Sequence, residues 1–264
     1  MCLILFALHS HPQYPLVLAA NREERHARAT APMAPWADVP DLLAGRDLEA
    51  GGTWLGLHRE GRFAAITNMR EGVATTAALR SRGALTRDFL APKSGHTLSA
   101  ADYSQQVYAE RAYYAGFNLL IGDDSGFWYC ASAAAPQLLT PGIYGLSNGL
   151  LDTPWPKVTR GKKALREIIE RPADASSMRA DLLALLSDHS QPLDHELPDT
   201  GVGLEVERLL GRCFISGAEY GTRASTALLI DRAGDAVIAE QNFGPNGVAR
   251  ELNSYRWPLA AIPC

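Results

Sequence analysis

The chain has 264 residues, of which 47% are hydrophobic and 20% are charged, and this composition is typical of a folded globular protein. The formal net charge is −4 and the Lys and Arg residues are scattered, so the sequence does not predict binding to nucleic acid. The cysteines are too few for a disulfide scaffold in a chain of this length, and none forms a C-x-x-C pair: Cys2, Cys130, Cys213 and Cys264. We therefore expect reduced thiols and a cytoplasmic location.

Two apolar stretches open the chain, over residues 1–8 and 16–20, and a polar segment separates them. A signal peptide has a basic start followed by an unbroken apolar run, and a membrane-spanning helix needs about 18 apolar residues. No Lys or Arg precedes Arg22, and neither apolar stretch reaches that length. The sequence therefore predicts two strands joined by a turn, Cys2–Leu8 and Leu16–Ala20, and no membrane span.

The next part of the chain is predicted to alternate between irregular segments, hairpins and helices. A long proline-rich segment, Asn21–Gly52, is expected to be irregular. Turn-forming residues between short apolar runs then predict two hairpins, Thr53–His58 with Arg62–Asn68 and Gly116–Ile121 with Gly126–Ser132. Two helices are expected between them, Gly83–Leu90 and Ser99–Arg111, the second with Ser99 as its N-cap.

The second half of the chain is predicted to be helical first and extended at its end. Two or three helices are expected between Pro156 and Leu210, with breaks at Ser176-Ser177 and at Pro192. Three strands follow in the prediction: Cys213–Ser216, Arg223–Ile230 and Ala236–Gln241. Strands at both ends with helices between them favour an α+β fold with mainly antiparallel sheets, formed as one domain over residues 1–264.

Cys2 is the first candidate for chemistry. Removal of Met1 ahead of a small residue leaves a free α-amino group on Cys2, and such a group has a pKa of about 7.7–8.0. It is therefore able to act as a general base near neutral pH for the thiol of the same residue. The alternative is that Cys2 is an incidental small hydrophobic residue at the start of a strand.

A charged cluster, Asn21-Arg22-Glu23-Glu24-Arg25, follows the second predicted strand directly. Such a cluster is often only a solvated turn. If the first two strands pair as a hairpin, however, residues 21–23 lie within a few residues of Cys2. A carboxylate there is suited to orienting the α-ammonium group, and an arginine is suited to favouring the thiolate.

The histidines give a weaker indication of a metal or haem site. His9 and His11 lie in the predicted first turn, where both side chains would be able to face one way. Two exposed turn histidines are the simpler interpretation, because the sequence contains neither an H-E-x-x-H motif nor a C-x-x-C-H motif. We predict no required metal or organic cofactor.

The ordered motifs of the chain resemble the NRDE family, which includes the animal transport and Golgi organization proteins. The resemblance rests on an N-terminal Met-Cys and on a series of segments in the family's order: Asn21–Glu24, Ala44–Asp47, Gly51–Gly56, Thr67-Asn68, Ser81–Gly83, Gly145–Asn148 with Trp155–Lys157, and Tyr220–Arg223. It covers nearly the whole chain. The third position of the name-giving motif is Asp in the family and Glu23 here.

That family in turn looks like the cysteine branch of the N-terminal nucleophile (Ntn) hydrolases, which includes penicillin V acylase and bile salt hydrolase. The resemblance implies a four-layer αββα sandwich, with Cys2 as nucleophile. It also implies an oxyanion hole made by the Met69 N–H, in the pair Asn68-Met69, and by the Asn148 side chain, and it matches Asn21, Glu23 and Arg223 in whole or in part. Arg22 lies in a neighbouring register, and Arg46-Asp47 is either an exposed turn or a loop that lines the site. The arginine that precedes this motif in the acylases falls on Ala19, so bile-salt or penicillin specificity is not implied.

The implied function is hydrolysis of an amide or thioester bond in a small acyl substrate. The rival interpretation is a non-catalytic carrier that uses the same cleft to bind haem or an acyl lipid, since the family has been linked to haem handling and a fold does not guarantee an activity.

Overall fold

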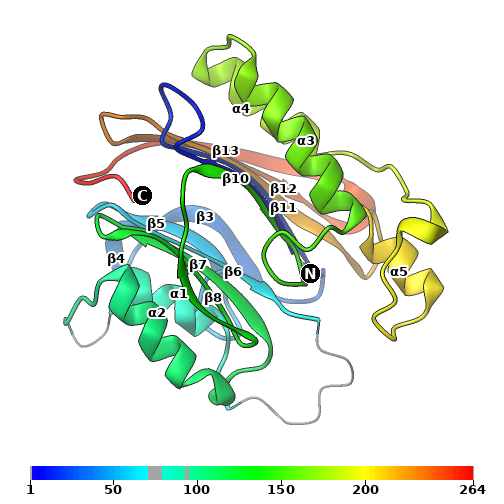
Figure 1. The fold of residues 1–264 in the computed structure, drawn as a ribbon, viewed down its shortest axis with the longest axis horizontal. Coiled ribbons are helices and arrows are strands. Elements are labelled where there is room, and N and C mark those ends of the chain that lie inside the picture. The colour runs from blue at the N-terminus through cyan, green and yellow to red at the C-terminus, as the bar shows by residue number, and fades with distance from the viewer. Residues whose placement is uncertain (1, 71–78, 93–94, 264) are drawn as a thin grey trace.

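Two antiparallel β-sheets stack face to face, and helices cover the outer face of each (Figure 1). The computed structural model describes residues 2–70, 79–92 and 95–263. Figure 1 shows α3 (Pro156–Glu170) and α4 (Ala175–Leu186) over one sheet, and α1 (Gly83–Leu90) and α2 (Ala100–Ala109) over the other. A further short helix, α5 (Leu204–Leu210), lies at the side of the sandwich. The predicted four-layer αββα sandwich of the α+β class is confirmed.

The first sheet has the strand order β10-β1-β2-β11-β12-β13. Its strands are β1 (Cys2–Leu8), β2 (Leu16–Arg25), β10 (Gly142–Leu146), β11 (Tyr220–Ile230), β12 (Asp235–Phe243) and β13 (Ala249–Pro258). The second sheet has the order β3-β4-β5-β6-β7-β8-β9. Its strands are β3 (Thr30–Trp36), β4 (Val39–Asp47), β5 (Leu55–His58), β6 (Arg62–Asn68), β7 (Phe117–Asp123), β8 (Gly126–Ala131) and β9 (Ala134–Leu138).

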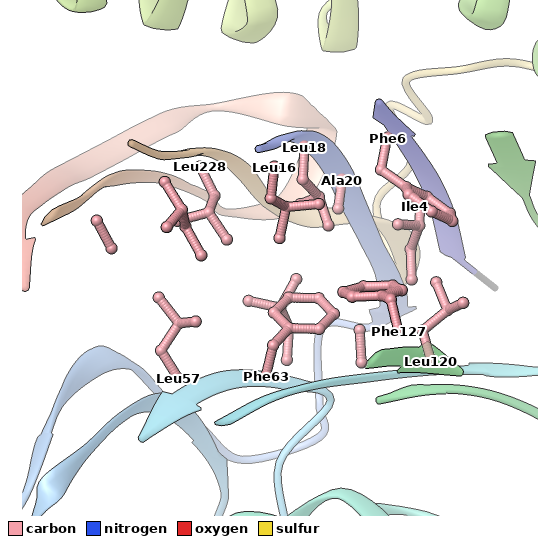
Figure 2. Close-up of a cluster of buried hydrophobic side chains, with 14 of the residues drawn as sticks. Ile4, Phe6, Leu16, Leu18, Ala20, Leu57, Phe63, Leu120, Phe127 and Leu228 are labelled. Carbon is pink, nitrogen blue, oxygen red and sulfur yellow. The ribbon is translucent and has the colours of Figure 1, made fainter. Parts of the chain in front are cut away.

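The core between the two sheets is built from alternate residues of their strands, because successive side chains of a strand point to opposite faces. Figure 2 shows Ile4, Phe6 and Leu18 of the first sheet facing Phe63 and Phe127 of the second. The intervening residues of β1 and β2 point outward and pack under α3 and α4. The outer face of the second sheet packs in the same way against α1 and α2.

Several sequence predictions are confirmed to the residue or nearly so. The first strand and the first helix have the predicted bounds, and the side chain of Ser99 caps α2 by accepting from the Asp102 N–H. The two predicted hairpins are present as β5–β6 and β7–β8. None of the described helices is long and apolar enough to cross a membrane.

Other predictions were wrong. The segment expected to be irregular contains the end of β2 and all of β3 and β4; its prolines fit because β3 is an edge strand, where a missing N–H breaks no ladder bond. Ser176-Ser177 does not break a helix but lies in the first turn of α4, capped by Asp174. Residues 213–216 form no strand, and β9, β10 and β13 were not predicted.

Candidate functional site

Cys2 begins β1, in the interior of the first sheet, between β10 and β2. Its partner across the β1–β2 ladder is Arg22, as the hairpin prediction requires. By strand alternation Cys2 faces the same way as Ile4, toward the second sheet, and Arg22 shares this face with Ala20. The thiol and the guanidinium group therefore lie on the side of the sheet that faces its partner sheet.

A cleft of about 190 Å³ opens between the two sheets at this end of the sandwich, and Cys2 lines it. An engineered cavity of roughly 150 Å³ holds benzene, so this cleft accommodates a small molecule or one end of a larger one. One wall comes from β2, β11, β12 and β13, and the other from β3, β4, β6 and the start of α1. Of the predicted site residues, those that line it are Cys2, Arg22, Glu23, Arg46, Asp47, Asn68 and Arg223.

The Cys2 thiol is largely buried, with 8% of the residue exposed. Burial raises the pKa of the thiol above its ordinary value, while the Glu23 backbone and the charge of Arg22 act in the opposite direction. The thiol is therefore mainly protonated at neutral pH, and attack on a carbonyl needs a base within reach.

Glu23 lies behind the nucleophile, with its buried carboxylate next to an equally buried ammonium group. Lys157 Nζ is 3.7 Å from Glu23 Oε2, and at most 1% of either side chain is exposed. Burial raises the pKa of Glu23, and the charge of Lys157 opposes that rise. A charged pair this deep requires both partners, so Lys157 belongs to the site although the sequence analysis quoted it only as part of a family motif.

Asn21 faces the helices rather than the cleft. Its Nδ2 donates to the carbonyl oxygens of Leu186 and Cys213, each at 2.9 Å, and its Oδ1 accepts from Ser225 Oγ at 2.6 Å. These bonds join β2 to β11 and to the end of α4. Asn21 therefore holds the strand that carries Arg22 and Glu23, and it does not line the cleft.

The two expected oxyanion donors already make hydrogen bonds to the protein. The Met69 N–H donates to the Gly116 carbonyl at 2.9 Å, so it is not free in this arrangement. Asn148 Nδ2 donates to the Asn68 carbonyl at 2.7 Å, and Asn148 Oδ1 accepts from Ser147 Oγ at 3.2 Å. Ser147 Oγ also lies 3.0 Å from the Cys2 carbonyl oxygen, so this segment is fixed against the start of β1.

Arg46 and Asp47 lie on the opposite wall and are held by separate ion pairs. Arg46 makes two hydrogen bonds to the carboxylate of Asp38, at 2.6 and 2.9 Å, and stacks over Trp36. Asp47 accepts from Arg28 Nη2 at 2.7 Å. Both residues therefore form part of the cleft wall, and the charge of each is already balanced by an ion pair.

Arg223 occupies a β-bulge, where the register of β11 on β2 shifts between Thr222 and Ala224. A bulge leaves one residue unpaired and re-aims its side chain. Arg223 Nη1 donates to the carbonyl oxygens of Arg25 and Arg28, and Nη2 donates to Thr30 Oγ1 at 2.8 Å. Burial lowers the pKa of Arg223, and the nearby charges of Arg22 and Arg250 lower it further.

Two residues on the same wall were missed by the sequence analysis. Glu240 accepts from the Met33 N–H at 2.7 Å and from Asn242 Nδ2 at 3.2 Å, and burial raises its pKa. Arg250 lies in β13, a strand that was not predicted at all. The apolar end of β11, residues 227–230, was the available signal that further strands had to cover the sheet beyond it.

The histidines do not contribute to the cleft. His11 is buried, not exposed as predicted; its Nδ1 accepts from the backbone N–H groups of Gln13 and Tyr14, and its ring stacks on Tyr14. Among the described residues no group of three or more His, Cys, Asp or Glu side chains is placed to hold a metal ion. The described residues that line the cleft include no histidine.

Comparisons with known proteins agree with the ordered motifs of the chain. The sequence model of the family described as Transport and Golgi organisation 2 matches residues 1–245. The chain is 35% identical to the Transport and Golgi organization protein 2 homolog of Bos taurus, over 92% of this chain and 93% of that protein. It is 33% identical to the homolog of Homo sapiens, over 98% and 99% of the two chains.

A solved structure of the Caenorhabditis elegans ortholog of N-acylethanolamine-hydrolyzing acid amidase is similar with a TM-score of 0.47 and 10% identity, covering 86% of this chain and 92% of that chain.

Proposed function

The chain belongs to the Transport and Golgi organisation 2 family, and from this premise we propose that it is an N-terminal-cysteine hydrolase that cleaves an amide or thioester bond of a small acyl substrate. The observation that carries the proposal is the position of Cys2. Its thiol lies in the wall of the cleft, where removal of Met1 in the proposed processing would place the amino group of the same residue.

In the proposed reaction, removal of Met1 exposes the α-amino group of Cys2, which accepts the thiol proton. The sulfur forms a bond to the substrate carbonyl carbon, the C–N or C–S bond breaks, and the leaving group departs with that proton. Water then attacks the thioester with the same amine as base and releases the acid, which regenerates the thiol. Glu23, balanced by Lys157, would orient the amino group from behind the strand.

The oxyanion that forms during attack needs a donor. We propose the Asn148 amide for this role, through the N–H that remains beside its bond to the Asn68 carbonyl. Loss of one such donor typically lowers kcat by about 10²–10³. Asn148→Ala should therefore reduce turnover by this factor, with melting temperature as the check that the fold persists.

The test begins with the intact mass of the purified protein, which should lack Met1. Hydrolysis of a panel of small amides and thioesters should then disappear in Cys2→Ala. It should persist in Cys130→Ala, which changes a more deeply buried thiol on the outer face of the other sheet. Retention of Met1, or hydrolysis that persists in Cys2→Ala, would contradict the proposal.

Iodoacetamide labelling tests the activation of the thiol independently of any substrate. Cys2 should react faster at neutral pH than Cys130 and Cys213, because it lines the cleft and, in the proposed reaction, has the α-amino group as a base. Cys130 and Cys213 do not line the cleft, and burial raises the pKa of each to about 12. Equal labelling of the three residues in the folded protein would contradict an activated nucleophile.

A further inference from the structure

The charges that line the cleft are not balanced along its length. Of its arginines, Arg28 pairs with Asp47, and Arg46 pairs with Asp38. Arg82 Nη1 donates to the Gly116 carbonyl. Three arginines on the wall of the first sheet have no such carboxylate partner among the described residues: Arg22, Arg223 and Arg250.

These three guanidinium groups lie close enough to affect one another. Burial lowers the pKa of Arg223, the charges of Arg22 and Arg250 lower it further, as like charges do at short range, and the charge of Glu24 opposes this lowering. Arg223 uses its donors on backbone carbonyls and a threonine. Arg22 and Arg250 make no side-chain hydrogen bond to any other residue that the structure describes.

The carboxylates on the same wall compensate only in part. Glu240 is buried, and its raised pKa means that it carries its charge less readily than an exposed glutamate. Glu24 lies 4.0 Å from Arg28 and accepts from the Arg25 N–H. Glu251 is exposed, as is Arg250. Glu23 is paired with Lys157. Because Glu240 carries its charge less readily, the three arginines leave this wall with an excess of positive charge.

Gly244 leaves room for the guanidinium group of Arg250. A Cβ atom at this position would lie 2.8 Å from Arg250 Nε and 3.0 Å from Arg250 Nη2. The guanidinium plane thus rests directly against the glycine backbone, in space that any side chain would occupy. The glycine in the β12–β13 connection therefore determines where the charged group of Arg250 lies.

We propose that Arg22, Arg223 and Arg250 form an anion subsite beside Cys2, which binds a carboxylate or phosphate group of the substrate. The inference rests on the proposed function and narrows it: the substrate is a small acyl compound with an anionic group a few bonds from the scissile carbonyl. Planar guanidinium groups suit both anions, because each presents paired N–H donors to two oxygens.

The test compares two alkylating agents of nearly equal size, iodoacetate and iodoacetamide, at Cys2 of the processed protein. The ratio of their rate constants, read by peptide mass spectrometry, cancels the thiolate fraction and leaves the preference for the anion. The same cysteine in the urea-unfolded chain gives the reference ratio. Because a hydrogen bond to a charged group is worth about 1.5–3 kcal/mol, the folded protein should exceed the reference about tenfold or more.

Variants locate the effect. Arg22→Gln and Arg250→Gln should each lower the ratio toward the reference, and Gly244→Ala should act like Arg250→Gln because its methyl group displaces the guanidinium. Arg256→Gln is the matched control, since Arg256 is on the same strand and exposed like Arg250, but it is bonded to Asp235 at 2.6 Å and does not line the cleft. A ratio equal to that of the unfolded chain, or one that no cleft variant changes, would overturn the subsite.

Protection identifies the anion. Glutarate and inorganic phosphate, added separately, should slow the reaction of iodoacetate at Cys2, and the stronger protectant indicates which group the substrate carries. Protection by neither would overturn the proposal. These measurements do not depend on catalytic turnover. A high ratio without hydrolysis of any amide or thioester would contradict the catalytic function and support the anion subsite. Hydrolysis together with a ratio equal to the reference would support the catalytic function and contradict the anion subsite.

Discussion

Lys157 occupies a position that ordinary helix electrostatics disfavours. It is the second residue of α3, where the helix dipole is positive, and its side chain is buried. Among the residues that the structure describes, Glu23 is the carboxylate that forms an ion pair with it. The two residues therefore depend on each other, and the pair fixes the end of α3 against the back of the strand beside Cys2.

Replacement of Lys157 by Met should leave the buried Glu23 carboxylate without the charge of Lys157. Such a change typically costs about 3–5 kcal/mol, which urea unfolding would measure as a lower free energy of unfolding. Lys163→Met, at an exposed position of the same helix, is the control and should change little. The double variant Lys157→Met with Glu23→Leu should recover part of the loss; a double variant worse than the sum of the singles would contradict the pairing.

Residue chemistry explains why the sequence predicted some of this site and missed the rest. Cys2 and Arg22 were placed together because the register of a tight hairpin follows from its turn. The partner of Glu23 comes from a helix more than 130 positions away in the sequence, and a local sequence pattern does not predict a contact over that separation. The Met69 N–H was assigned by resemblance, and its bond to Gly116 depends on the pairing of β6 with β7, which only the three-dimensional structure gives.

At the scale of elements, the Gly51-Gly52 pair serves the packing of α1 against the turn before β5. A Cβ atom on Gly52 would lie 2.3 Å from the Gly83 carbonyl oxygen, and the Thr53 N–H donates to that same oxygen. Both backbones approach closely at the rim of the cleft. The glycine is needed for this approach, not for binding a phosphate group.

Gly52→Ala should push the turn away from α1 and lower the free energy of unfolding by about 1–3 kcal/mol, as overpacking does. Gly83→Ala is the matched comparison, because a Cβ there meets its nearest neighbour, the Thr53 carbonyl, at 3.3 Å. Thermal melts of the two variants should differ clearly. Equal melting temperatures would show that the close approach has no energetic importance.

Glu240 links the two sheets through its bond to the Met33 N–H of β3. Burial raises its pKa in the folded chain above the unfolded value of about 4.3, so the folded state holds this proton more tightly. The resulting stabilisation is complete below that unfolded value and is lost as the pH rises through the raised pKa. Glu240→Gln should remove this loss and flatten the dependence of urea midpoints on pH between 4 and 8; an unchanged slope would contradict the raised pKa.

The sequence predicted an element correctly where a single local signal determines its structure. It failed where the position of a strand in the sheet determines the structure. The N-cap Ser99 and the glycine of the β5–β6 turn act within a few residues, and both elements were predicted correctly. In β3 and β4 the prolines outweighed the pattern in the prediction, whereas the fold places β3 at an edge where they are tolerated. The edge strand β13 is mostly exposed and lacks a buried alternating pattern, so its sequence resembles a loop.

For the whole molecule, the end of the sandwich remote from the cleft is closed by the C-terminal segment. Trp257 is buried in the core between the sheets, and Arg59 of the β5–β6 turn stacks on its ring at 3.8 Å. The Ala260 N–H donates to the Arg59 carbonyl, and the Leu259 N–H donates to the Gly234 carbonyl. One segment therefore holds both sheets together at the end opposite Cys2.

Trp257→Ala should cost about 3–5 kcal/mol of unfolding free energy, because it empties a large volume between the sheets. Labelling of Cys2 by iodoacetamide should keep its native rate at temperatures where the variant is folded, since the two ends of the sandwich are separate. A changed rate at Cys2 would indicate that closure of the far end also shapes the cleft.

The place of β1 in the sheet has a practical consequence for handling this protein. Cys2 starts an interior strand flanked on both sides, and it lines the cleft. If Cys2 acts as proposed, an affinity tag fused ahead of it would convert the required amine into a peptide bond. Purification should therefore rely on a handle at the carboxyl terminus, or on a leader that a protease removes to leave cysteine first.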